Sequence, residues 1–183
     1  MSDALAGNPA NLNPVFELEP EQLYNVTAPI PVGVGNVTIK LSGLADRKDG
    51  SKPALIEVDT DESFAAVAAG AYLSLTGVNV TRSQASQERR RRRLQTGLSN
   101  PALVSNDGGT LTISGSELRS EDSPVLSSAS GDITISSSVI SGRVLAEEGK
   151  VTLSGSSFAD SSPLVMAVSN AELVVGAGNS FKA

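Results

Sequence analysis

The sequence predicts an all-β protein built from a repeated unit of short strands, and three observations lead to this fold class. Apolar and polar residues alternate over short runs, as in "TLTISGSEL" at 110–118, which is the pattern of a half-buried strand. Only 3% of residues are aromatic and no window keeps an apolar period near 3.6 residues, so a helix is expected at most over 19–24. The alternating run recurs about every 20 residues, which is typical of a solenoid.

Each repeat is predicted to contain a strand, a corner and a second, shorter strand. In one copy Leu111 and Ile113 point to the core, Gly115 bends the chain, and Leu118 returns it to the core. The copies occupy 72–80, 110–118, 132–140, 150–158 and 172–181. Further apolar strands are predicted at 101–105, 123–128, 142–147 and 162–168.

These copies predict the domain organisation. Residues 1–35 contain five prolines, and we expect an irregular arm and a cap over the unpaired edge of the first unit. Residues 36–183 are predicted to form one repeat domain of about five to seven units. The step from Leu73 to Leu111 is 38 residues, and subtracting the 18 residues of the polar segment 82–99 leaves 20, one ordinary repeat. That segment is therefore predicted to be a loop inserted between two units.

The last repeat ends close to the end of the sequence, because Phe181 is a predicted core position and Ala183 is the last residue. Such an end leaves core side chains and a strand edge without a neighbouring unit. We expect either a shortened chain, or self-association or a partner subunit at this open end.

The repeat pattern resembles the right-handed parallel β-helix of pectate-lyase-like proteins, whose units commonly read like "GKVTLSGSSF" at 149–158. The resemblance covers about 36–181 and implies a right-handed solenoid, in line with the general rule for parallel crossovers. It also implies polysaccharide lyase, hydrolase or epimerase chemistry, which in proteins of this fold uses clustered aspartates with calcium or paired aspartates. In this chain the carboxylates mostly lie at corners and do not recur at one position of successive units. No catalytic, cofactor or metal residue is therefore assigned, and a non-catalytic role is favoured.

Composition and charge exclude several classes of function. The chain has no Cys, His or Trp, which excludes thiol nucleophiles, disulfides, Cys/His zinc sites and imidazole bases. Its formal net charge is −6, so nucleic acid is not an expected partner. No apolar stretch is long enough to span a membrane, and the first residues do not resemble a signal peptide. Three Asn-Val-Thr triplets nevertheless indicate an extracellular or cell-surface origin and possible N-glycosylation, at Asn25, Asn36 and Asn79.

A candidate surface comes from the outward residues of successive strands. If the repeats stack in register, hydroxyl side chains form a ladder that Thr38 and Ser74 extend. Three interpretations stay open: a solvated strand face, a face that binds sugar hydroxyls, and an ice- or crystal-binding face, which the charged neighbouring column 110, 132, 150 and 172 disfavours. The ladder residues are Thr112, Thr134, Thr152, Ser114, Ser136 and Ser154.

The run "ERRRRRL" at 88–94 is the basic exception in an acidic chain. Three interpretations compete: a polyanion contact, a site for a proprotein-processing protease, and a disordered insertion whose charges stay solvated. The arginines are Arg89, Arg90, Arg91, Arg92 and Arg93.

The function expected from all of this is a structural or ligand-presenting solenoid of a secreted or cell-surface protein. The main alternative is a protein of the same fold that binds or modifies carbohydrate, with a polysaccharide as partner. The other alternative is an ice- or crystal-surface binder that uses the hydroxyl ladder.

Overall fold

The computed structural model describes residues 13–42, 53–95, 100–121, 123–159 and 166–182. Within these ranges the chain is dominated by β-strands in two parallel sheets, and the one helix is α1 (Gln84–Gln95). This confirms the all-β class, and the parallel pairing is compatible with the predicted solenoid. No helix in the described part of the chain is long and apolar enough to cross a membrane.

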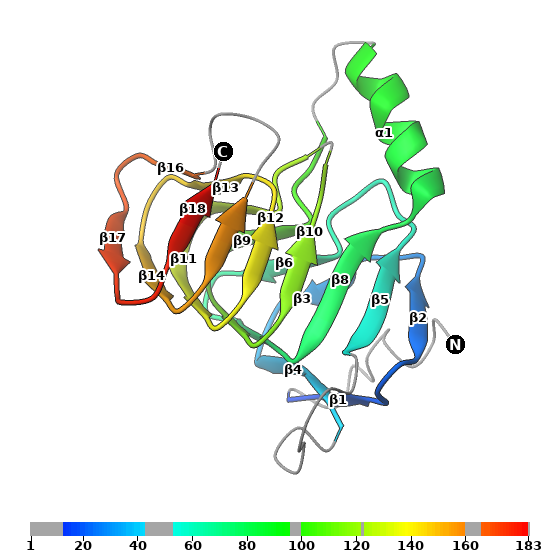
Figure 1. The fold of residues 1–183 in the computed structure, drawn as a ribbon, viewed down its shortest axis with the longest axis horizontal. Helices are drawn as coiled ribbons and strands as arrows, with labels where there is room; N and C mark the ends of the chain where they lie inside the picture. Colours follow the sequence, from blue (N-terminus) through cyan, green and yellow to red (C-terminus); the bar gives the residue numbers. More distant parts are fainter. Residues whose placement is uncertain (1–12, 43–52, 96–99, 122, 160–165, 183) are drawn as a thin grey trace.

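In the described ranges the larger sheet has 11 strands, which pair in parallel with the equivalent strands of neighbouring repeats (Figure 1). Two of them are long because each pairs with two short strands in succession: β9 pairs with β6 and β7, and β11 pairs with β13 and β14. The strands are β1 (Val15–Leu18), β3 (Ile30–Val32), β4 (Asn36–Leu41), β6 (Ala65–Ala68), β7 (Tyr72–Thr76), β9 (Val104–Ser114), β11 (Leu126–Ser136), β13 (Val144–Ala146), β14 (Lys150–Ser154), β16 (Met166–Val168) and β17 (Glu172–Val175).

The second sheet has seven strands among the residues that the structure describes, and they lie side by side in chain order, seen broadside in Figure 1. They include the short strands predicted after each corner, such as the one that begins near Leu118. The strands are β2 (Leu23–Val26), β5 (Ala54–Val58), β8 (Val78–Arg82), β10 (Glu117–Arg119), β12 (Val139–Ser141), β15 (Ser157–Ala159) and β18 (Ser180–Lys182).

One hydrophobic core joins the inner faces of both sheets, because the alternation of each strand places the same kind of residue inside at every repeat. Burying each of these side chains stabilises the fold by about 1.5–3 kcal/mol. In the larger sheet one buried row is Leu73, Leu111, Ile133 and Val151. In the second sheet the matching row is Ile56, Val80, Leu118, Ile140 and Phe158.

Buried serines connect the repeats at the corner between the two sheets. Ser116, Ser138 and Ser156 each donate a hydrogen bond from Oγ to the backbone oxygen two residues before, at 2.9, 2.7 and 2.9 Å. Each Oγ also accepts a hydrogen bond from a backbone N–H of the preceding repeat, for example from Ser116 to Ser138 at 3.2 Å. Asn179 continues the ladder in the last repeat, where its Oδ1 accepts from Ser156 N at 2.9 Å. The small polar residues of the repeat therefore satisfy backbone groups that the corner would leave unpaired.

The C-terminal end of the core is exposed. Phe181 stacks on Phe158 with ring centroids 5.0 Å apart and so continues the buried row of the second sheet. Its side chain is 49% exposed and that of Leu173 is 43% exposed, because no strand among the described residues lies beyond β17 and β18. The predicted core positions are thus aligned with the core rows but only half covered.

Two expectations about the N-terminal half differ from the structure. The helix expected over 19–24 is wrong: Pro20 and Glu21 form a turn, and the chain then enters β2 at Leu23. Residues 1–12 of the expected arm lie outside the described residues. Residues 13–35 contain β1, β2 and β3, which pair with strands of both sheets. Residues 160–165 of the strand predicted over 162–168 also lie outside the described part, and β16 covers the rest.

Candidate functional site

The predicted hydroxyl ladder lies on the outer face of the larger sheet. Thr112 pairs in register with Thr134, and Thr134 pairs with Thr152, so the three side chains form one column. Ser114, Ser136 and Ser154 form a second column beside it. Strand β7 adds one residue to each column through Ser74 and Thr76. We call these eight residues the hydroxyl grid: Ser74, Thr76, Thr112, Ser114, Thr134, Ser136, Thr152 and Ser154.

The grid is a regular, uncharged array. Parallel strands are about 4.8 Å apart, and alternate residues on one strand are about 6.8 Å apart, so hydroxyl groups repeat in both directions. Its side chains are half-buried, except that Ser154 is exposed. Two borders carry charge. Asp132, Lys150 and Glu172 form the next column, and Lys150 Nζ lies 3.4 Å from Glu172 Oε1. At the N-terminal border, β4 continues the two columns with Thr38 beside Ser74 and Lys40 beside Thr76, and Lys40 Nζ lies 2.8 Å from Glu17 Oε1. The border opposite the charged column is the corner with Gly115, Ser137 and Gly155, which adds no charge.

The arginine segment is a docked helix, so the predicted disordered insertion with solvated charges is wrong. Helix α1 begins after Ser83, whose Oγ accepts a hydrogen bond from Ser86 N at 3.0 Å as an N-cap. Ser86 and Arg90 lie four residues apart on one face of the helix, and both are buried. Figure 1 shows α1 leaving the end of β8. The helix attaches through polar side chains, which explains why an apolar period did not reveal it.

Arg90 holds the helix against two turns of the chain. Its Nη1 donates to the backbone oxygen of Pro101 at 2.8 Å. Its Nη2 donates to the backbone oxygens of Asp61 at 2.9 Å and Glu62 at 3.1 Å. Because the guanidinium is fully buried, these carbonyl groups take the place of water around its charge.

Arg82, the last residue of β8, bridges the same two turns. Its guanidinium donates to backbone oxygens of Thr60 and Ala102, each at 3.1 Å, and also to those of Glu62 and Pro101. Burial lowers the pKa of Arg82 to about 9, and the nearby charge of Arg90 acts in the same direction. At pH 7 the Arg82 guanidinium therefore remains charged, and Arg82 and Arg90 together form one buried clamp on the two turns.

Arg89 adds an ion pair at the edge of this clamp. Its Nη2 lies 2.8 Å from Asp59 Oδ1, and its Nε lies 2.9 Å from Asp61 Oδ1. Hydrogen bonds from Arg89 and from the Ser83 hydroxyl lower the pKa of Asp59 below its ordinary value of 3.8. Because the folded-state pKa is the lower one, this contact stabilises the fold above pH 3.8 and is lost as the pH falls through the folded-state pKa.

Of the other arginines in the run, Arg91 and Arg92 lie toward solvent. Arg91 is exposed and its Nη2 lies 3.6 Å from Glu121 Oε2, while Arg92 is exposed at the same end of the helix. Arg93 is half-buried. The five predicted residues are therefore separated into a docking group and a solvent group, which the sequence did not distinguish. Whether this segment meets a protease or a polyanion stays a prediction.

The three glycosylation candidates lie on strands. Asn25 in β2 and Asn36 in β4 are exposed. Asn79 in β8 is half-buried, and its Nδ2 donates to Glu117 Oε2 at 3.4 Å. The Asn79 side chain is therefore less accessible than the other two.

Carboxylates and other potential metal ligands do not gather in the part of the chain that the structure describes: no three His, Cys, Asp or Glu side chains there could hold an ion together. Asp59 and Asp61, the alternating carboxylates of "DTDES", face Arg89 instead. No protein-family model matches the chain, and no curated protein matches its sequence. The resemblance to pectate-lyase-like proteins therefore rests on the strand pattern alone.

Proposed function

We propose that this chain is a right-handed parallel β-helix that acts without catalysis and presents the hydroxyl grid to a polysaccharide outside the cell. The parallel register of both sheets supports the solenoid, because every repeat adds a strand to each sheet in the same order. The second sheet supports the same arrangement, because its described strands pair in parallel in chain order.

The observation that carries the proposal is the grid itself. Hydroxyl groups donate and accept hydrogen bonds, as sugar hydroxyls do, so each row can exchange bonds with a sugar unit. A repeating array also meets a repeating polymer at several points, and each further contact forms at a high effective concentration. The grid carries no charge and the whole chain has a net charge of −6, which favours a neutral polymer over a polyanion.

Affinity electrophoresis tests this function. The protein is run through native gels that contain a neutral β-glucan, and through gels with polygalacturonate with and without calcium. We expect retardation in the β-glucan gel. Replacing Ser136 by Lys in the middle of the grid should reduce the retardation at least fivefold, because a long cationic side chain holds the polymer away from the hydroxyl groups.

Ser141→Lys is the matched control for that experiment. Ser141 points outward on β12 in the second sheet, so the same change adds the same charge away from the grid. Retardation of this variant should equal that of the unmodified protein. The proposed function would be contradicted if no polysaccharide slowed the unmodified protein in the gel. It would also be contradicted if both lysine variants lost the same amount of retardation.

The extracellular part of the proposal has a separate test in a eukaryotic secretory pathway. We expect glycans on Asn25 and Asn36, whose side chains are exposed, and none on the half-buried Asn79. Asn25→Gln and Asn36→Gln should each remove one endoglycosidase-sensitive band shift, and Asn79→Gln should leave the pattern unchanged. An unmodified secreted protein would argue against glycosylation at these positions.

A further inference from the structure

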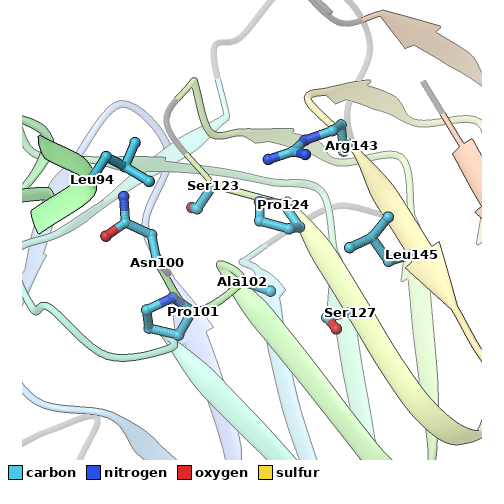
Figure 2. Close-up of a pocket in the computed structure, with 9 residues that line it drawn as sticks. All are labelled: Leu94, Asn100, Pro101, Ala102, Ser123, Pro124, Ser127, Arg143 and Leu145. Carbon is cyan, nitrogen blue, oxygen red and sulfur yellow. The ribbon is translucent and has the colours of Figure 1, made fainter. Parts of the chain in front are cut away.

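A half-open cleft of about 350 Å³ lies between the C-terminal end of α1 and the outer face of β11 and β13 (Figure 2). This volume lies at the low end of the range for small-molecule sites, which is roughly 300–1,000 Å³. Leu94 of the helix forms one wall, and Pro101, Pro124 and Leu145 form much of the rest. Because Leu94 comes from α1, the docked helix helps to build the cleft.

The cleft exposes apolar surface to water. The Leu94 side chain is 49% exposed, and Pro101, Pro124 and Leu145 are half-buried. A ligand with an apolar body would cover this surface and gain about 25 cal/mol for each Å² removed from water. The volume limits such a ligand to the size of one ring with a short substituent.

Among the described residues that line the cleft, Arg143 is the one with a cationic side chain. Figure 2 shows its side chain extending beside Pro124, with the guanidinium toward Ser123. Among the described residues this guanidinium makes no hydrogen bond and no ion pair, whereas Arg89, Arg91 and Arg119 each face a carboxylate. A half-buried guanidinium beside apolar walls is a strong donor for an anion that enters the cleft.

We propose that this cleft binds a small organic carboxylate. The carboxylate group accepts two parallel hydrogen bonds from the Arg143 guanidinium, whose planar fork matches its geometry. The apolar body of the ligand lies against Pro101, Pro124 and Leu145. One guanidinium balances the single charge of a carboxylate, and the outward side chain of Ser127 at the cleft wall offers a further hydroxyl group.

This site is separate from the hydroxyl grid. Ser127 and Leu145 lie on the part of the larger sheet before the bend at Gly131 and Gly149, and the grid lies after it. A failure of polysaccharide binding at the grid would therefore not contradict carboxylate binding in the cleft.

Titration of the ¹⁵N-labelled protein with sodium benzoate, followed by NMR, tests the proposal. Benzoate combines one carboxylate with one ring, and benzamide provides the same body without the charge. We expect benzoate to shift the amide signals of residues 125–127 and 143–145, and benzamide to shift them far less. Arg143→Gln should weaken benzoate binding at least tenfold.

Arg119→Gln is the matched control, because Arg119 points outward on β10 in the second sheet and lies outside the cleft. The affinity of the Arg119→Gln variant for benzoate should match that of the unmodified protein. Arg143→Gln removes no side-chain hydrogen bond and no ion pair among the described residues, so the spectrum of this variant should show an intact fold. Equal binding of benzoate and benzamide, shifts confined to α1, or an unchanged affinity in Arg143→Gln would each overturn the proposal.

Discussion

Gly131→Ala is expected to lower the free energy of unfolding by about 3 kcal/mol or more. Gly131 lies at the bend inside β11 with φ of 91°, a conformation that residues with a side chain rarely adopt. A methyl group there would overlap the carbonyl oxygen of Gly109 in the preceding repeat. Both groups are backbone, so relief requires the two repeats to move apart and to weaken the parallel ladder between β9 and β11.

Urea denaturation measures this effect, and two glycines provide the controls. Gly115 also has a positive φ, of 55°, but a methyl group there meets no atom within 4 Å. Gly115→Ala should therefore cost only the local backbone strain, about 1 kcal/mol. Gly33 has open space and no positive φ, so Gly33→Ala should change stability by less than about 0.5 kcal/mol. Similar losses for Gly131→Ala and Gly115→Ala would show that contact between repeats does not limit this position.

The strand pattern is the part of the fold that could be predicted from the sequence. Alternation over five residues decides which face of a strand is buried, and a constant step between repeats decides which residues are neighbours. Thr112, Thr134 and Thr152 are in register for this reason. The same alternation and the same step between repeats predicted the row of core residues that contains Leu118 and Ile140.

Features that depend on contacts between distant side chains were not predictable in this way. Helix α1 has no apolar face, so the only signals in the sequence were the Ser83 N-cap and good helix formers such as Gln, Ala, Glu and Arg. The docking partners of Arg90 are backbone oxygens, which leave no mark on the sequence. The cleft beside Arg143 likewise combines residues from α1 and two repeats, whose separation in the sequence hides their proximity.

Arg90→Met is expected to undock helix α1 and to lower the free energy of unfolding by about 2–4 kcal/mol. Methionine fills part of the space but cannot donate, so the backbone oxygens of Pro101 and Asp61 lose a charged partner. The Nη1 and Nη2 groups of Arg82 already donate to four backbone oxygens of these turns, so they cannot also replace both Arg90 bonds. The strands on either side keep their ladders, so the loss should be concentrated in the helix and in the turns that it covers.

Limited trypsin digestion followed by mass determination resolves this local effect. Cleavage needs an extended segment, so the docked helix should be cut slowly at Arg89 and Arg91 in the unmodified protein. Arg90→Met should be cut there at least tenfold faster, while circular dichroism still reports the β-sheets. Arg92→Met is the matched control, because Arg92 is exposed and should leave the rate at the other arginines unchanged. Fast cutting of the unmodified protein would contradict a docked helix, because it would mean that the helix leaves the sheet in solution. That result would instead support the interpretation of the arginine run as a site for a processing protease.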